Sequence, residues 1–389
     1  MTFSIKTLNA ISHAGLSQLP RENYVVSSDV EAPDALILRS ANLHGVEIPP
    51  SVRAVARAGA GTNNIPVTEY SARGIPVFNT PGSNANAVKE LVIAAIFLAA
   101  RNIIDAAAFA HRLDGDAAGM DKAVESGKKN FVGFELPGRT LGVIGLGAIG
   151  VEVANAATGL GMRVMGYDPG ITVEHAWKLS SFVEHVTSLE QLLKRADIVT
   201  VHVPLVDATR GLVGARELEL MKKSAVVVNF ARGPIVDAGA VVAAIDAGRL
   251  RGYVCDFPTP ELNRHPHVVT LPHLGASTNE AEENSARMAA LELRAYLEDG
   301  IITNSVNFPD AVLPRGEGTT RIAIANSNVP NMVGQISSLV AAAGLNIADL
   351  LNKSRGELAY TLVDVNGEVP DALLAQIRGI EGVLSARVI

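Results

Sequence analysis

Three residues whose side chains can bind anions or move protons each follow a predicted strand in the second half of the chain. They are Arg232, Glu261 and His273. A guanidinium group can hold a carboxylate and polarise a neighbouring oxygen. An imidazole can accept a hydroxyl proton near neutral pH, and a carboxylate beside it fixes its tautomer. This combination is suited to removing a hydride from a 2-hydroxy acid.

Each of the three residues also has an ordinary structural explanation when it is considered alone. An arginine after a strand commonly forms a surface ion pair, and a lone glutamate is commonly solvated. A lone histidine is more often a structural residue than a catalytic one. The three therefore indicate chemistry only together, and only in a fold that binds a nicotinamide cofactor.

Residues 141–168 indicate such a fold. An apolar run, Leu141–Ile144, is followed by Gly145, Gly147 and Gly150 in the pattern G-x-G-x-x-G, and then by a helical stretch. In a dinucleotide site the first glycine allows a tight turn, the second lets the pyrophosphate approach the backbone, and the third lets the helix pack against the sheet. The N–H groups at the start of the helix attract phosphate.

A second apolar strand, Arg163–Tyr167, ends at Asp168. A carboxylate at this position can accept hydrogen bonds from the adenosine ribose and repels a 2′-phosphate. The sequence therefore predicts NAD rather than NADP. A glycine pattern alone is weak evidence, but here strand, helix, strand and acidic residue occur in the required order.

Length, charge and cysteine content limit the class of protein. The 389 residues are enough for two or three domains, and 48% hydrophobic with 4% aromatic residues favours α/β sheets. The net charge of −7 argues against a nucleic-acid surface. The single cysteine, Cys255, fits a reducing compartment. The first ten residues lack the pattern of a signal peptide, and the apolar stretch Leu91–Ala100 is too short to span a membrane. We expect a cytoplasmic protein without membrane contacts or a metal site.

The order of predicted elements indicates three domains of α/β character. We predict a doubly wound Rossmann NAD domain (90–276) inserted in a flavodoxin-like substrate domain (1–89 and 277–308). A Pro- and Gly-rich linker (309–319) leads to a ferredoxin-like βαββαβ module (320–389) with one face of its sheet available. A single Ala-rich helix is expected over 84–111. Outside the glycine-rich unit, strands of the first two domains are expected at Ser4–Asn9, Ala35–Leu38, Val52–Ala56, Ile75–Phe78, Ile198–Val203, Ala225–Asn229, Tyr253–Cys255 and Val268–Thr270.

Four motifs together resemble the D-isomer-specific 2-hydroxyacid dehydrogenases, over nearly the whole chain. They are the glycine pattern, the segment 231–233, the Asp256-Phe257 pair followed by Glu261, and the segment 272–278. Within that family the chain is similar to the phosphoglycerate-oxidising enzymes that carry a C-terminal ACT regulatory domain. The resemblance implies that Arg232, Glu261 and His273 form the active site, with His273 as proton donor and acceptor.

The resemblance also implies a set of residues around NAD. Asp256 is expected near the nicotinamide carboxamide, but a structural cap at the end of its strand explains it equally well. The segment 202–204 should flank the adenine. The implied cofactor-binding residues are Gly145, Gly147, Ala148, Ile149, Gly150, Asp168, His202, Val203, Pro204, Phe230, Ala231, Arg232, Asp256, His273, Gly275 and Ala276.

Two segments that follow strands of the first domain resemble substrate-contacting segments of the phosphoglycerate enzymes. Arg39 and Arg57 in these segments would supply positive charge for a phosphate and a carboxylate on a protein that is negative overall. Surface ion pairs are the alternative for either arginine. The implied substrate-binding residues are Arg39, Ser40, Arg57, Asn86, Arg232 and His273. The implied reaction is NAD-dependent oxidation of 3-phospho-D-glycerate to 3-phosphohydroxypyruvate, the first step of L-serine biosynthesis.

The C-terminal module resembles an ACT domain in its loop after the first strand. In serine-regulated relatives, amides at such positions bind L-serine across a pair of modules. Asn326, Asn328 and Asn346 are the implied effector-binding residues here. The alternative is that these asparagines form turns and the module only mediates dimerisation. A homodimer or homotetramer is expected in either case.

Two other functions compete with this interpretation. The first is a different D-2-hydroxyacid dehydrogenase, such as a glyoxylate or hydroxypyruvate reductase. The arginine pair and the ACT-like module argue against it. The second is a non-catalytic NAD-sensing protein that binds partner proteins. The intact set of Arg232, Glu261 and His273 argues against that function.

Overall fold

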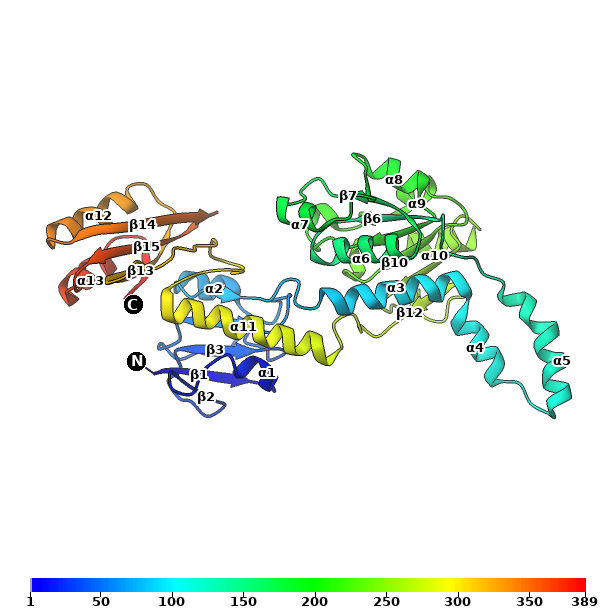
Figure 1. Cartoon of the computed structure of the whole chain (residues 1–389), viewed down its shortest axis with the longest axis horizontal. Coiled ribbons are helices and arrows are strands. Elements are labelled where there is room, and N and C mark those ends of the chain that lie inside the picture. Colours follow the sequence, from blue (N-terminus) through cyan, green and yellow to red (C-terminus); the bar gives the residue numbers. More distant parts are fainter. Residues whose placement is uncertain (1) are drawn as a thin grey trace. The chain divides into compact units, whose positions relative to one another are not determined.

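The computed structural model describes residues 2–389, and their contacts divide them into two compact units (Figure 1). The first unit combines the chain up to Ser83 with Asn279–Ile389, and the second is Asn84–Thr278. The divisions fall at 83/84 and 278/279, where the sequence analysis placed domain boundaries at 89/90 and 276/277. The C-terminal module, expected as a separate domain, is grouped with the first unit.

The first unit contains a five-stranded parallel sheet with the strand order β2-β1-β3-β4-β5. This is the flavodoxin-like order, which confirms that prediction. Strands β3 and β4 are almost wholly buried, as expected when helices cover both faces of a parallel sheet. The elements are β1 (Phe3–Leu8), α1 (His13–Leu16), β2 (Tyr24–Ser27), β3 (Ala35–Leu38), β4 (Ala54–Arg57), α2 (Val67–Ala72), β5 (Val77–Phe78) and α11 (Asn279–Asp299).

The second unit contains a seven-stranded parallel sheet with the order β12-β11-β10-β9-β6-β7-β8. The order reverses at β6, as in a doubly wound Rossmann fold, and this confirms the predicted fold class. Its strands are β6 (Thr140–Ile144), β7 (Arg163–Tyr167), β8 (Glu184–His185), β9 (Ile198–Val201), β10 (Val226–Asn229), β11 (Gly252–Cys255) and β12 (Val268–Thr270). Its helices are α3 (Ala85–Arg101), α4 (Ile103–His111), α5 (Ala117–Gly127), η1 (Lys128–Phe131), α6 (Ala148–Gly159), α7 (Val173–Lys178), α8 (Leu189–Arg195), η2 (Asp207–Thr209), α9 (Ala215–Leu220), η3 (Gly233–Ile235) and α10 (Ala238–Asp246).

The single helix expected over 84–111 is two helices in the structure. Asn102 adopts the left-handed conformation (φ 50°, ψ 38°), which asparagine tolerates better than most residues, and it ends α3 before α4 begins. The two helices diverge by 66°.

Among the described residues no single helix is long and apolar enough to cross a membrane. The bent pair α3 and α4 meets the length and composition criteria only when its two helices are taken together.

The C-terminal module has the predicted βαββαβ order. Its antiparallel sheet is ordered β14-β15-β13-β16, as in ferredoxin-like folds, and α12 and α13 pack on one face through an aliphatic core (Figure 1). The elements are β13 (Thr319–Ser327), α12 (Met332–Ala342), β14 (Asn346–Arg355), β15 (Leu358–Asn366), α13 (Asp371–Arg378) and β16 (Val383–Val388).

The other face of this sheet, expected to be available, is covered by the rest of the first unit. Tyr360 and Leu362 belong to the same hydrophobic core as the sheet β1–β5 and helix α11. Arg387 donates to the backbone oxygens of Tyr296 and Leu297, in the last turn of α11. Arg321 donates to the oxygen of Asp299 in the same turn, at 2.9 Å. Guanidinium groups therefore bind the carbonyls at the carboxyl end of α11, where positive charge is favoured.

The segment 309–319 is not an extended linker throughout. Ala311 is fully buried and exchanges backbone hydrogen bonds with Ile302, and Leu313 is 9% exposed. The composition of the segment predicted a linker, but these apolar residues have joined the core of the first unit.

A buried carboxyl group in α11 should make stability depend on pH. Burial raises the pKa of Glu292 to about 8, and one of its oxygens has no hydrogen-bond partner among the described residues. Between about pH 4.5 and 8 the folded state retains a proton that the unfolded state has released, so the unfolding free energy falls as the pH rises.

Glu292→Gln removes this titration. We expect the variant to match the parent near pH 4.5 and to exceed its unfolding free energy by about 1–3 kcal/mol above pH 8. Urea unfolding at several pH values measures the difference. Glu283→Gln, an exposed change on the same helix, should show no such trend, and a pH-independent difference for Glu292→Gln would contradict the assignment.

Candidate dinucleotide and active site

The turn between β6 and α6 has the geometry predicted from its glycines. A Cβ atom on Gly145, which has φ 90°, would lie 2.6 Å from the carbonyl oxygen of His202. A Cβ atom on Gly150 would lie 1.9 Å from the oxygen of Gly145, so the helix can approach the strand only with glycine there. Among the described residues, no atom outside the adjoining backbone lies within 4 Å of a Cβ position on Gly147. This open backbone is what the approach of a pyrophosphate requires.

Helix α6 begins at this turn with unused N–H groups. Gly147 is its N-cap and supplies no side-chain hydrogen bond to the first turn. The amides near Ala148 and Ile149 therefore lie at the positive end of a twelve-residue helix. The residues fit a dinucleotide phosphate at this position.

Asp168 lies beside the same turn, directly after β7. Its carboxylate accepts hydrogen bonds of 2.8 Å from the backbone N–H groups of Leu146 and Gly170. Each carboxylate oxygen can accept a further hydrogen bond. The arrangement fixes the acidic group next to the glycine-rich turn, as the predicted ribose contact requires.

We expect Asp168→Ala to weaken NAD binding by about 10–100-fold, because hydrogen bonds to a charged group are lost. NADP binding should weaken much less, because the charge that repels the 2′-phosphate is also lost. Calorimetric titration with both cofactors measures the change. The exposed substitution Asp121→Ala is the control, and unchanged selectivity in Asp168→Ala would place the ribose elsewhere.

His202 follows β9 on the other side of the glycine-rich turn. Burial lowers the pKa of His202 to about 3, so the imidazole is neutral. Its Nε2 lies 2.9 Å from the Thr200 hydroxyl, and its buried Nδ1 has no partner among the described residues. The predicted adenine-flanking residues Val203 and Pro204 follow it in the chain.

The loop that carries Arg232 is held by two buried side chains that the sequence analysis did not identify. Asn229, at the end of β10, donates to the Arg232 oxygen at 3.0 Å and accepts from the Ala231 N–H at 3.1 Å. The same amide donates to the Tyr253 hydroxyl at 3.3 Å. The Arg232 side chain is exposed, so the buried network fixes the backbone and leaves the guanidinium accessible. An amide that ends a buried strand is a signal that could have been recognised in the sequence.

Asp256 is a structural cap in this structure. It follows β11, is 1% exposed, and accepts 2.8 Å hydrogen bonds from the N–H groups of Leu274 and Gly275. The cap is present in the structure, and the contact with the nicotinamide carboxamide stays a prediction. The carboxylate fixes the turn that begins at His273, whose backbone is left-handed (φ 57°) and whose side chain is exposed.

Glu261 is not paired with His273 in this structure. Glu261 is exposed, and a hydrogen bond with Thr259 lowers its pKa. The His273 ring lies instead 5.3 Å from the ring of Phe257. The pairing of Glu261 with His273 in catalysis therefore stays a prediction.

Arg39 and Arg57 lie next to each other in the first unit. Strands β3 and β4 are neighbours with Leu38 opposite Arg57, so both arginines come at the carboxyl edge of the sheet. The Nε of Arg57 donates to the Arg39 oxygen at 3.0 Å, and its guanidinium also donates to the Gly61 oxygen. The Arg39 side chain forms an ion pair with Glu282 at 2.6 Å.

Two other predicted substrate residues, Ser40 and Asn86, belong to different units. Ser40 is in the first unit, where its N–H donates to the Asn9 side chain at 3.2 Å. Asn86 is in the second unit, in the first turn of α3, and its amide donates to Glu90 at 2.9 Å. Both are accessible for a ligand contact.

The three predicted effector residues are not together in one chain. Asn326 is 1% exposed and bonds within the sheet to Ser327 and Thr361, which conflicts with direct contact to an effector. Asn328 is exposed and lies beside the turn between β14 and β15, whereas exposed Asn346 begins β14 at the opposite end. A ten-residue strand separates these ends by about 30 Å. A site that uses both positions therefore needs two modules.

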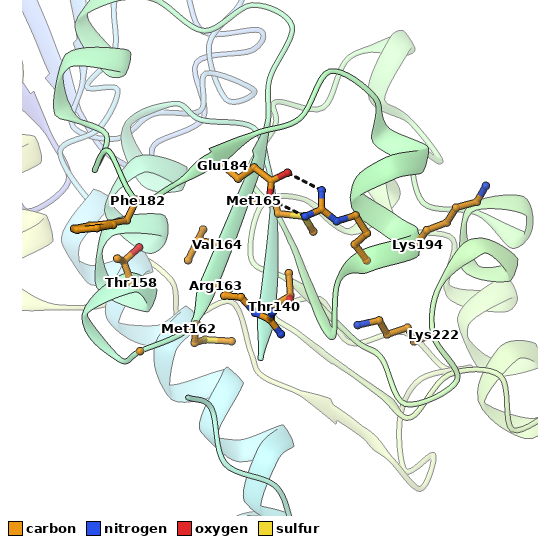
Figure 2. Close-up of a pocket in the computed structure, with 12 residues that line it drawn as sticks. Thr140, Thr158, Met162, Arg163, Val164, Met165, Phe182, Glu184, Lys194 and Lys222 are labelled. Atoms are coloured by element: carbon orange, nitrogen blue, oxygen red, sulfur yellow. Dashed lines mark hydrogen bonds and ion pairs between the residues drawn. The ribbon is translucent and has the colours of Figure 1, made fainter. Parts of the chain in front are cut away.

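A cavity of about 770 Å³ in the second unit lies at the amino ends of β6 and β7 (Figure 2). Of its basic side chains, Arg195 pairs with Glu184 at 2.6 Å, Lys222 with Asp197 at 2.8 Å and Lys194 with Glu190 at 2.5 Å, whereas Arg163 donates to the backbone oxygen of Gly138. The glycine-rich turn and Asp168 lie at the opposite ends of these strands. This cavity is therefore separate from the predicted dinucleotide site.

Comparisons with known proteins agree with this geometry. Residues 93–275 match the model of the D-isomer specific 2-hydroxyacid dehydrogenase NAD binding domain. The D-3-phosphoglycerate dehydrogenase of Haemophilus influenzae is 34% identical over 355 residues, which are 88% of this chain and 83% of that protein. The enzyme of the same name from Escherichia coli K12 is 34% identical over 342 residues, which are 85% of this chain and 79% of that protein.

Among solved structures, Rhodotorula graminis D-mandelate dehydrogenase shares the fold. Its TM-score is 0.67 at 24% identity, over 81% of this chain and 100% of that one. The glycine-rich turn, Asp168 and the matched NAD binding domain assign the second unit to NAD. The chain belongs to the D-isomer specific 2-hydroxyacid dehydrogenase family.

Proposed function

We propose that this dehydrogenase oxidises 3-phospho-D-glycerate at C2 to 3-phosphohydroxypyruvate with NAD, the first step of L-serine biosynthesis. The adjacent position of Arg39 and Arg57 at the edge of the first sheet carries the proposal. Two guanidinium groups at one edge, on a chain with net charge −7, favour a ligand with more negative charge than one carboxylate. The similarity to two D-3-phosphoglycerate dehydrogenases supports the same substrate.

The chemical roles follow from the side chains of the second unit. NAD, held by the glycine-rich turn and Asp168, would supply the acceptor for the hydride of C2. His273 accepts the proton of the C2 hydroxyl, so that the C–H and O–H bonds are replaced by a carbonyl. Arg232 binds the substrate carboxylate and polarises the C2 oxygen. Glu261 would orient the imidazole and stabilise its charged form, once the two groups are in contact.

The other predicted substrate-binding residues are assigned to the phosphate group of the substrate. Arg39 and Arg57 bind the phosphate, and Ser40 and Asn86 supply further hydrogen bonds. The buried network around Asn229 and the cap formed by Asp256 maintain the positions of the reacting side chains.

Reduction of 2-oxo acids with NADH tests the choice of substrate. We expect 3-phosphohydroxypyruvate to be reduced with the highest kcat/KM, and hydroxypyruvate and glyoxylate far more slowly, because they lack the phosphate. Faster reduction of glyoxylate or hydroxypyruvate would instead assign a reductase of that class. Binding of NADH without turnover of any 2-oxo acid would favour the non-catalytic alternative.

We further propose that the C-terminal modules pair in a homodimer or homotetramer and bind L-serine between them. Asn328 of one module and Asn346 of the other would provide the amides. Asn326 is left out of this site because it is buried. Serine can inhibit only if it binds better to a less active conformation, with couplings of about 1–3 kcal/mol.

Asn346→Ala is expected to abolish inhibition by L-serine and to retain turnover without serine, because the residue lies in the C-terminal module. Initial rates over a serine titration measure this. Asn366→Ala is a matched control, since Asn366 is exposed and pairs with Asn346 across the two strands. Failure of wild-type protein to bind serine in calorimetry would leave the module with an assembly role.

A further inference from the structure

The guanidinium of Arg39 is occupied by a carboxylate from a distant helix. Nη1 of Arg39 lies 2.6 Å from Oε1 of Glu282. Arg39 directly follows β3, and Glu282 is in the first turn of α11. Both belong to the first unit, so the pair is a feature of one compact body.

Helix α11 holds Glu282 at this place. Ala281, Ser285, Ala286 and Ala289 are buried, and the last two belong to the core that contains the sheet β1–β5. An acidic residue in the first turn is also favoured by the positive end of the helix. The carboxylate is therefore presented to Arg39 by a rigid element.

The ion pair is weak enough to open. The side chains of Arg39 and Glu282 are 41% and 43% exposed, and exposed ion pairs contribute little stability. Arg57 lies beside this pair, where its Nε donates to the backbone oxygen of Arg39 and another guanidinium nitrogen donates to the oxygen of Gly61. The carboxylate that compensates the charge of Arg39 is therefore one that a bound anion can displace.

We propose that Glu282 is an internal counter-ion that competes with the substrate's phosphate for Arg39. This inference rests on the proposed function and adds a residue that sets substrate affinity. A dianionic phosphate displaces Glu282 from Arg39, whereas a substrate without phosphate leaves the pair closed. The competition weakens binding of the phosphate equally in the ground state and in the transition state. It therefore raises KM and leaves kcat unchanged.

Glu282→Gln tests the competition. We expect KM for 3-phospho-D-glycerate to fall by about two- to fivefold, the range that corresponds to an exposed ion pair. The kcat, the KM for NAD and the KM for D-glycerate should stay unchanged. Glu283→Gln is the matched control, because it removes a neighbouring exposed charge of the same helix. In an Arg39→Ala background, Glu282→Gln should have no further effect on KM.

Two results would overturn the proposal. An unchanged KM would mean that Glu282 does not compete, and a raised KM would mean that it orients Arg39 for the substrate. Binding of inorganic phosphate, measured by calorimetry on the parent and Glu282→Gln, separates this proposal from the proposed function. If the parent does not turn over 3-phospho-D-glycerate, the proposed function fails, but tighter phosphate binding by the variant still supports the competition. Equal phosphate binding contradicts it.

Discussion

Replacement of His273 by alanine is expected to lower kcat by about 10²–10⁴-fold, the usual contribution of a general acid or base. The imidazole is the one group assigned to the proton of the C2 hydroxyl, and its exposed ring lies on a turn fixed by Asp256. The affinity for NAD should change little, because the glycine-rich turn and Asp168 are untouched. Steady-state kinetics and calorimetric titration with NADH measure the two quantities.

His267→Ala is a matched control for this variant. His267 is also exposed and left-handed, with φ 68° compared with 57° for His273, but it has no assigned role. We expect its kcat to equal that of the parent. Near-normal turnover in His273→Ala would remove this residue from the mechanism and leave the proton acceptor unassigned.

The largest expected loss of stability comes from the C-terminal module. Arg321 and Asp364 form a doubly hydrogen-bonded ion pair at 2.6 and 2.7 Å, with side chains 0% and 1% exposed. Asp364→Ala leaves a buried guanidinium without its counter-charge, which costs about 3–5 kcal/mol. Urea unfolding should show this loss, and hydrogen exchange should increase over residues 319–389.

A double variant separates the loss of a partner from the loss of the pair. Replacing Arg321 by Met and Asp364 by Leu removes both charges, and such replacements are often neutral or stabilising. We therefore expect the double variant to be more stable than Asp364→Ala. Glu190→Ala, which removes an exposed pair with Lys194, should cost less than about 1 kcal/mol. Equal losses in the single and double variants would show that packing, and not the charge, is responsible.

The parallel sheets could be predicted from the sequence because a strand buried on both faces is a local apolar run. Strands β3, β7 and β12 have the predicted bounds. Strand β2 was missed because it is a short edge strand with only Tyr24 buried, and an edge strand lacks that signal. The break at Asn102 was missed because the apolar periodicity continues on both sides of it.

The site could be predicted where the chemistry is local in sequence. The glycine-rich turn and Asp168 lie within one βαβ unit, and the structure has the expected close approaches there. Contacts between residues that are far apart in the chain could not be predicted from the sequence. The cap of the His273 turn by Asp256, the contact of Glu282 with Arg39 and the docking of the C-terminal sheet on α11 all depend on tertiary packing.

The C-terminal sheet is in contact with α11, the long helix of the first unit. Arg321 and Arg387 of the module bind the carbonyls at the carboxyl end of this helix. Glu282 lies in the first turn of the same helix and binds Arg39. The module is therefore in direct contact with the helix that holds the counter-ion of Arg39.

The ratio of kcat/KM for 3-phospho-D-glycerate to that for D-glycerate tests the central claim most directly. The two substrates differ only in the phosphate, and NADH formation reports both reactions. We predict that the phosphorylated substrate is preferred by at least about 10²-fold, since two charged hydrogen-bonding groups are assigned to it. The preference should collapse in Arg39→Ala and Arg57→Ala. Equal kcat/KM values in the parent, or an undiminished preference in both variants, would contradict the assignment of this chain to phosphoglycerate oxidation.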